Sequence, residues 1–141
     1  MITYVDTSVL LKVLVDDEVG GEAAQRLWLE SDYLVCAEIG YTEARAALAS
    51  AHRSGRLDDH ALRTAKRQLG ALWEQIDIVP VTTELVHTAG DLAEIEALRG
   101  YDAVHLAAAI AAHVTVVATA DTNLFEAARR RRFDVSNPSW E

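Results

Sequence analysis

Short apolar runs alternate along the chain with longer stretches in which apolar residues recur at every third or fourth position. The short runs are typical of strands buried on both faces, and the longer stretches are typical of amphipathic helices. Strands are predicted at 2–5, 33–36, 76–81, 114–118 and 133–135. Helices are predicted at 8–15, 22–30, 38–54, 59–75, 84–98, 102–113 and 123–131. This alternation indicates βαβ units around a parallel sheet and therefore an α/β fold.

Glycine, aspartate and proline positions support several of these boundaries. Gly55 and Gly100 follow the third and fifth predicted helices, and Asp58 or Asp59 can cap the fourth helix. Pro80 falls in the third predicted strand, where its missing N–H is tolerated mainly at the edge of a sheet. We therefore expect the third strand to be outermost.

Residues 103–112 are apolar on every side except at His105. This pattern predicts a helix buried against the sheet rather than one lying on the surface. His105 is one helical turn beyond Asp102, but a packed core histidine is a better interpretation than a general base.

The composition is that of a globular protein. The chain has 141 residues, of which half are hydrophobic and a quarter charged, so we expect residues 1–141 to form a single domain. Cys36 is the only cysteine and lies in an apolar run, which predicts a buried, inert thiol and excludes a disulfide framework. We see no basic leader segment and no apolar run of about 20 residues, so we expect a cytoplasmic protein and no membrane partner.

The net charge of −9 ordinarily counts against a nucleic-acid partner, because phosphates attract cations. A nuclease that gathers carboxylates to hold a metal ion is acidic at its centre until the ion binds. The overall charge therefore does not exclude a nuclease.

Three aspartates lie where ligands bind in α/β proteins. Asp6 ends the first predicted strand and Asp121 follows the fourth, and ligands bind at the carboxyl ends of parallel strands. Asp102 opens the buried helix, where the partial positive charge of the helix terminus favours a carboxylate. Each of the three has an alternative interpretation as a helix cap or turn residue.

Glu43 provides a stronger indication. At 100° per residue it shares a helix face with Gly40 and Ala47, and Arg45 falls on the opposite side. A carboxylate facing the core is costly unless it is paired or bound to a metal ion. Four oxygen ligands from separate segments suit Mg²⁺ or Mn²⁺, and no histidine–cysteine set has the spacing of a zinc site. The sequence therefore predicts one divalent-cation site.

Four segments together resemble the PIN-domain proteins, specifically the VapC-type toxin ribonucleases of prokaryotic toxin–antitoxin pairs. They are YVDTS at 4–8, TEA at 42–44, GYDAVHLA at 100–107 and TADTNL at 119–124. The resemblance covers nearly the whole chain and implies a three-layer α/β/α fold. Its central parallel sheet would have four to five strands in the order 3-2-1-4-5, flanked by about seven helices.

The resemblance also implies an activity and a set of site residues. It implies a Mg²⁺-dependent (or Mn²⁺-dependent) endoribonuclease that hydrolyses RNA phosphodiester bonds, is a toxin restrained by a VapB-type antitoxin, and is usually a homodimer. The catalytic and metal-binding residues would be Asp6, Glu43, Asp102 and Asp121, supported by Ser8 and Thr119. Arg99 and Lys12 are candidate RNA contacts, and Arg99 ranks first because it is three residues before Asp102.

Two alternatives stay open: a housekeeping PIN nuclease without an antitoxin, and a non-catalytic interaction module with the same fold. Two other classes fit poorly. A phosphoacceptor receiver domain needs an aspartate where the third strand ends in Val79-Pro80-Val81, and a haloacid-dehalogenase-like phosphatase needs a second aspartate where Ser8 stands.

Overall fold

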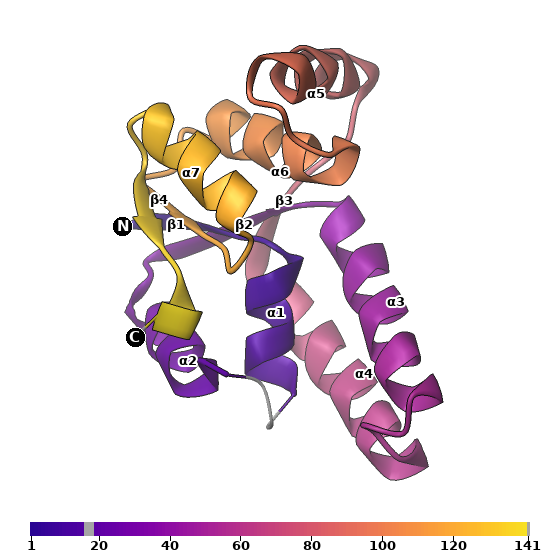
Figure 1. Ribbon diagram of the computed structural model, residues 1–141. Helices are drawn as coiled ribbons and strands as arrows, with labels where there is room; N and C mark the ends of the chain where they lie inside the picture. Colours follow the sequence, from indigo (N-terminus) through magenta and orange to yellow (C-terminus); the bar gives the residue numbers. More distant parts are fainter. Residues whose placement is uncertain (16–18, 141) are drawn as a thin grey trace.

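A computed structural model describes residues 1–15 and 19–140 of the chain. Its centre is a parallel sheet of five strands in the order β3-β2-β1-β4-β5, which confirms the predicted order (Figure 1). The strands are β1 (Ile2–Val5), β2 (Tyr33–Ala37), β3 (Ile76–Val79), β4 (Val116–Ala118) and β5 (Asp134–Ser136).

Seven α-helices among the described residues cover the two faces of the sheet. They are α1 (Thr7–Leu14), α2 (Gly21–Glu30), α3 (Ile39–Arg53), α4 (Asp59–Trp73), α5 (Thr83–Ile95), α6 (Gly100–Ala111) and α7 (Thr122–Arg130). In Figure 1, α5, α6 and α7 lie on one side of the sheet and α1, α2, α3 and α4 on the other, so the three-layer prediction is confirmed. A short 3₁₀ helix at Pro138–Trp140 was not predicted.

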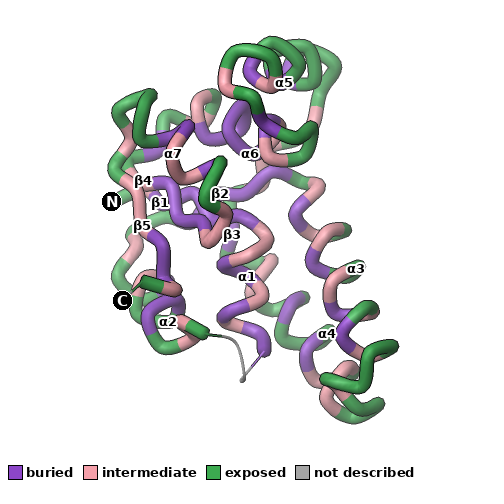
Figure 2. The backbone as a smooth tube through the Cα atoms, viewed as in Figure 1, coloured by how far each residue is buried: buried purple, intermediate pink, exposed green. Residues whose placement is uncertain are grey.

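Each face of the sheet has its own hydrophobic core, because successive strand residues point to opposite faces. Tyr4 packs with α5, α6 and α7, whereas its neighbour Val5 packs with α1, α2, α3 and α4. Both residues are fully buried, and Figure 2 shows the central strands as largely buried. The central strand therefore supplies side chains to both layers.

The third strand lies at the edge of the sheet, as Pro80 predicted, but it is shorter than expected. It ends at Val79, and the chain then turns, with the N–H of Thr82 donating to the carbonyl of Pro80 at 3.1 Å. The fixed φ of proline and its missing N–H account for the early end.

The buried helix expected at residues 102–113 is α6. Its residues Ala103 and His105 to Ala109 are all buried. Cys36 is also buried, as predicted, and burial raises the pKa of its thiol far above the usual range. Among the described residues, no helix combines the length and apolarity needed to cross a membrane.

Candidate functional site

Asp6 is both a helix cap and a buried acid. It follows β1 and caps α1, accepting a hydrogen bond from the N–H of Val9 at 3.3 Å. Its carboxylate also accepts bonds from the hydroxyls of Ser8 and Thr119, each at 2.5 Å, and the residue is only 4% exposed. Burial raises the pKa of Asp6, whereas the charge of His105 and these hydrogen bonds oppose the rise. Asp6 is therefore a helix cap, as the alternative interpretation predicted, and its role as a metal ligand stays a prediction.

Ser8 and Thr119 join the loops that follow β1 and β4. The hydroxyl oxygen of Ser8 accepts a hydrogen bond from the N–H of Ala120 at 2.9 Å. The hydroxyl oxygen of Thr119 accepts one from the N–H of Asp121 at 3.0 Å. Both hydroxyls thus donate to Asp6 and accept from the β4 loop, which fixes Asp6 relative to Asp121.

Arg99 connects Asp102 and Asp121. Its guanidinium lies 3.4 Å from a carboxylate oxygen of Asp102, in the first turn of α6, and 3.3 Å from one of Asp121, the N-cap of α7. Burial raises the pKa of Asp102, the charge of Asp121 raises it further, and Arg99 opposes both effects. Asp102 and Asp121 therefore form one negatively charged locus that attracts a cation.

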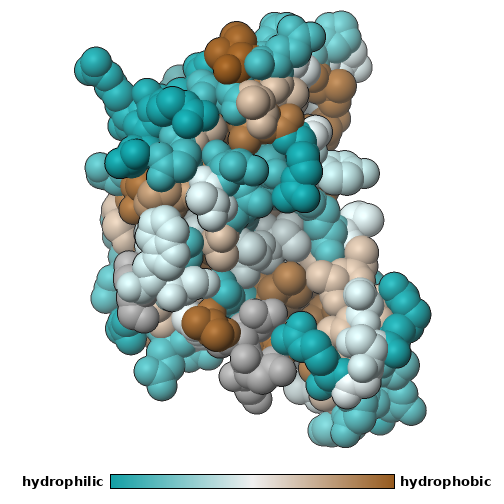
Figure 3. All heavy atoms as spheres, in the orientation of Figure 1, coloured by the Kyte–Doolittle hydropathy of each residue, from teal (hydrophilic) through white to brown (hydrophobic). Residues whose placement is uncertain are grey.

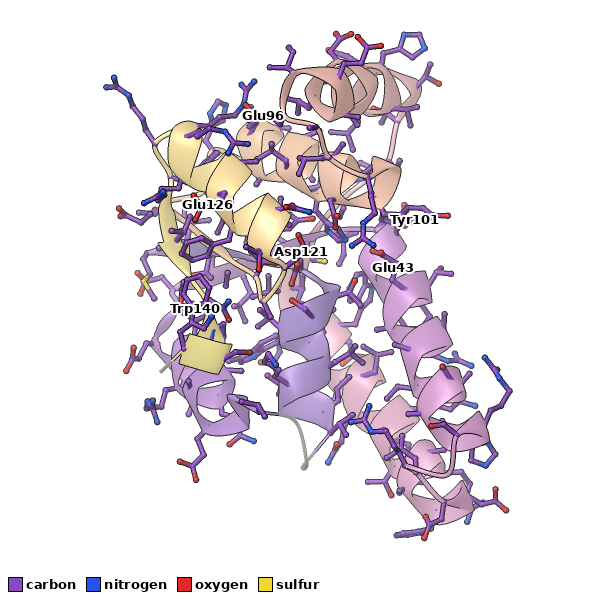
Figure 4. All side chains as sticks on the ribbon, in the orientation of Figure 1. Glu43, Glu96, Tyr101, Asp121, Glu126 and Trp140 are labelled. Atoms are coloured by element: carbon purple, nitrogen blue, oxygen red, sulfur yellow. The ribbon has the colours of Figure 1, made fainter. Side chains whose placement is uncertain are left out.

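Glu43 enters the site from α3 through a bond to α6. Its carboxylate lies 2.6 Å from Nε2 of His105 and accepts a bond from the hydroxyl of Thr7 at 3.1 Å. Burial alone would raise the pKa of Glu43, but the hydrogen bond and charge of His105, together with Thr7, lower it. Figure 4 shows Glu43 near the start of α3, on the side of Tyr101 and Asp121.

The predicted core-facing orientation of Glu43 was wrong in detail. Its side chain is 26% exposed, and the residues of α3 that face the core are Gly40, Ala44, Leu48 and Ala51. Glu43 lies at the edge of this face, because the hydrogen bond to His105 turns its carboxylate toward the sheet end instead of into the apolar core.

A buried chain of hydrogen bonds holds His105. Its Nδ1 lies 2.6 Å from the Tyr4 hydroxyl, which also accepts a bond from the N–H of Ala37 at 3.0 Å. The N–H of Ala37 can only donate, so the hydroxyl proton of Tyr4 is free to point at Nδ1. This arrangement assigns the proton of the neutral ring to Nε2, which donates it to Glu43.

Protonation of His105 would disturb this chain. Burial lowers the pKa of His105, but the bond to Glu43 and the charges of Asp6, Glu43 and Asp102 outweigh burial and raise it. A proton on Nδ1 would turn the Tyr4 hydroxyl proton away from His105 and toward Cys36, whose sulfur also interacts with that hydroxyl. The acids favour the charged ring, and Tyr4 favours the neutral one.

Sequence reasoning missed the link between His105 and the acids. It predicted a buried histidine, and His105 is 2% exposed, but it did not place the ring between Tyr4 and Glu43. Two signals could have found the link. Tyr4 is two residues before Asp6 on the same face of β1, and His105 is one helical turn after Asp102.

The acids thus fall into two groups near the carboxyl ends of β1 and β4: Arg99 joins Asp102 and Asp121, and His105 contacts Glu43 and acts on Asp6. Asp6 and Asp121 both act on the charge state of Asp102, and Glu43 joins the group through His105. Within residues 1–15 and 19–140, no group of three or more histidine, cysteine, aspartate or glutamate side chains is arranged to hold a metal ion. The shared ion therefore stays a prediction.

Lys12 does not lie where an RNA contact would need it. It is 8% exposed, and its ammonium group donates to the carbonyl of Val19 at 2.7 Å. Arg99, in contrast, is exposed and touches two of the acids. The prediction for Lys12 is not supported, because the ammonium group is turned toward the chain itself.

A groove of about 590 Å³ adjoins the acids between α5 and α6. Glu43, Arg99 and Asp102 line one part of it, and Val86, Gly90 and Tyr101 line another. Tyr101 is 67% exposed. The charged locus is therefore open to a ligand that extends along an apolar surface.

Comparison with known proteins gives consistent results. The family model of the PIN domain matches residues 3–130. Ribonuclease VapC45 of Mycobacterium tuberculosis is 39% identical over 110 residues, covering 78% of this chain and 76% of the relative.

Solved structures show the same fold. The structure of PAE2754 from Pyrobaculum aerophilum has a TM-score of 0.74 at 18% identity and covers 99% of this chain and 85% of its own. A toxin–antitoxin complex from Klebsiella pneumoniae has a TM-score of 0.67 at 18% identity and covers 96% and 97%.

Proposed function

The chain belongs to the PIN-domain family, among the VapC ribonucleases, and we propose that it is a Mg²⁺-dependent endoribonuclease and the toxin of a VapBC-type pair. The observation that carries the proposal is the grouping of Asp6, Asp102 and Asp121 with Arg99 at the carboxyl ends of β1 and β4. The whole chain, residues 1–141, would act as one PIN domain.

The donors present fit a hard divalent cation. Asp6, Glu43, Asp102 and Asp121 offer only carboxylate oxygens, which suit Mg²⁺ and also Mn²⁺. Burial raises the pKa of Asp6 and of Asp102, and the charges of Asp121 and Asp6 raise that of Asp102 further, so a cation near Asp102 would be favoured. Arg99 already brings a positive group between Asp102 and Asp121, and a divalent ion would take over this neutralising role.

A divalent ion bound there supplies charge stabilisation for phosphodiester hydrolysis and lowers the pKa of water. The chain itself supplies the positioning. Ser8 and Thr119 hold the Asp6 carboxylate, and His105 holds Glu43. Asp121 is 25% exposed in its side chain, so its carboxylate is open to the attacking water and can accept a proton from it. Arg99, once released from the acids, can contact the substrate phosphate.

The partners follow from the relatives. A cognate VapB-type antitoxin would bind the toxin, as the toxin–antitoxin complex from Klebsiella pneumoniae illustrates for its own pair. Assembly as a homodimer is part of the same proposal. Without the antitoxin, the open groove beside Arg99 and Tyr101 would leave the acids accessible to RNA.

The test uses purified protein and total RNA. We expect cleavage with Mg²⁺, no cleavage with EDTA, and no cleavage by Asp6→Asn, because the substitution removes one charge from the ligand set. Thermal unfolding of Asp6→Asn checks that the variant folds. Full activity of a folded Asp6→Asn protein, or cleavage that survives EDTA, would contradict the proposal. Absence of cleavage by the native protein would favour a non-catalytic module.

A further inference from the structure

The helical hairpin of α3 and α4 has a charge opposite to that of the chain. Residues 39–73 contain six arginine or lysine residues and three acidic residues, whereas the whole chain has a net charge of −9. Figure 3 shows hydrophilic side chains gathered over the α3–α4 end of the molecule, at the lower right. A local excess of cations in an acidic protein indicates a surface for a polyanion.

Four of these cations line one shallow depression of about 340 Å³, which we call the basic patch: Arg45, Arg63, Lys66 and Arg67. No acidic residue lines it. Arg63, Lys66 and Arg67 are spaced i, i+3 and i+4 on α4 and therefore share a face, and Arg45 joins them from α3.

The cations of the basic patch have no carboxylate partner within the described chain. Arg99, Arg129, Arg130 and Arg131, in contrast, each contact a carboxylate. Like charges three or four residues apart on a helix destabilise it slightly. The patch thus carries a small stability cost that a bound polyanion would remove.

Aromatic side chains adjoin the basic patch. The guanidinium of Arg45 lies 5.8 Å from the ring centre of Tyr41 and donates to its hydroxyl at 2.9 Å. The Tyr41 ring in turn contacts that of Trp73, with centroids 5.6 Å apart, and both residues are half-buried. Cations beside aromatic rings are typical of surfaces that follow a single-stranded nucleic acid.

The basic patch begins on the side of α3 opposite to Glu43. Arg45 is two residues after Glu43 on α3, about 3 Å farther along the helix axis and roughly 200° around it. An RNA bound at the acids would therefore have to pass around α3 to reach Arg45 and the cationic face of α4.

We propose that the basic patch binds the phosphate backbone of the RNA substrate outside the cleavage site, an inference that rests on the proposed ribonuclease function. Contacts to phosphates position a nucleic acid without reading its sequence. The patch therefore contributes affinity and orientation to many RNAs, and the groove near Tyr101 and the acids is left to choose the cleaved bond.

The test is binding of a labelled 20-nucleotide single-stranded RNA in EDTA, with Asp6→Asn present in every protein so that nothing is cleaved. Arg63→Gln/Lys66→Gln removes two cations of the patch. Arg26→Gln/Arg132→Gln is the matched control, because both of its arginines are exposed and distant in sequence from the hairpin. A 20-residue poly-glutamate serves as a second probe for an acidic protein partner.

We expect the patch variant to bind RNA more weakly than the control and to lower the slope of log K against log salt by about 1.4. The ratio of the RNA affinity of the parent protein to that of the patch variant should shrink roughly sevenfold between 50 and 200 mM salt. Its melting temperature should equal or exceed that of the parent protein, because a like-charge contact is removed.

Equal RNA affinity of the patch variant and the control would overturn the proposal. A patch variant that loses affinity for poly-glutamate but not for RNA would also overturn it, and would assign the patch to an acidic protein partner. Cleavage assays in the native background separate the two proposals. If the native protein cleaves RNA and the patch variant does not raise KM, the basic patch fails; if the native protein cleaves no RNA, the ribonuclease function fails.

Discussion

Removal of the Tyr4 hydroxyl tests the hydrogen-bond chain that holds Glu43. In Tyr4→Phe, the N–H of Ala37 and Nδ1 of His105 lose a shared partner inside a fully buried region. A buried polar group left without a partner costs about 1–3 kcal/mol, so two such groups cost about 2–6 kcal/mol. Partial relaxation of the neighbouring side chains places the expected loss near 3 kcal/mol, in the lower half of this range.

The assay is thermal unfolding followed by circular dichroism. For a domain of this size each kcal/mol lowers the melting temperature by about 2–4 °C, so Tyr4→Phe should melt about 6–12 °C below the native protein. Tyr33→Phe is the matched control, because Tyr33 is 61% exposed and should lose almost nothing. Nitrogen NMR at pH 8.5 should find the proton of His105 on Nε2 in the native protein.

Two results would refute the reasoning. Equal melting temperatures for Tyr4→Phe and Tyr33→Phe would mean that the buried hydroxyl has no such role. A neutral His105 ring with its proton on Nδ1 instead of Nε2 would mean that Tyr4 accepts rather than donates, and that the ring does not donate to Glu43.

Three further predictions concern the acids. The pKa of Asp102 is raised in the folded protein, so ionised Asp102 destabilises the fold, and this effect disappears when the group is protonated at low pH. In EDTA, Asp102→Asn should therefore melt a few degrees above the native protein at pH 7, and the difference in melting temperature should close as the pH falls toward 4. Equal melting temperatures at pH 7 would contradict the inference that burial and the charge of Asp121 destabilise ionised Asp102. Arg99→Gln removes a cation that competes for Asp102 and Asp121, so Mn²⁺ should raise its melting temperature more than that of the native protein, whereas without metal the variant should differ from it by less than about 1 kcal/mol, as expected for exposed ion pairs. An equal Mn²⁺ response would argue against Arg99 as a competitor. Millimolar Mn²⁺ should raise the melting temperature of the native protein but not that of Asp6→Asn, and equal shifts would place the ion elsewhere.

The sequence predicted the fold well because its apolar runs and helix signals agree with one another. The strand order was implied by the family resemblance, and Pro80 independently placed the third strand at an edge. The errors in the predicted bounds lie at the ends of strands and helices. At β3, for example, a single proline decides whether the hydrogen bonding of the strand continues. Such ends depend on contacts that hydrophobic periodicity does not encode.

The places of three of the acids in the fold were predictable from the sequence, but the contacts that hold the acids were less so. Asp6, Asp102 and Asp121 stand at strand ends or helix starts that a linear pattern reveals. The bond from His105 to Glu43 joins residues 62 positions apart and depends on how α3 and α6 meet. Lys12 was misjudged for the same reason, because a cation in a sequence carries no sign of whether the fold turns it inward.

The strand order also determines when the site can form during synthesis on the ribosome. Because β1 lies between β2 and β4, Asp6 receives its Thr119 contact only after nearly the whole chain has been synthesised. A truncated or still growing product therefore lacks the loop that carries Asp121. The activity of this protein would therefore arise only when its translation is almost finished. An inhibitor synthesised earlier would already be present at that moment.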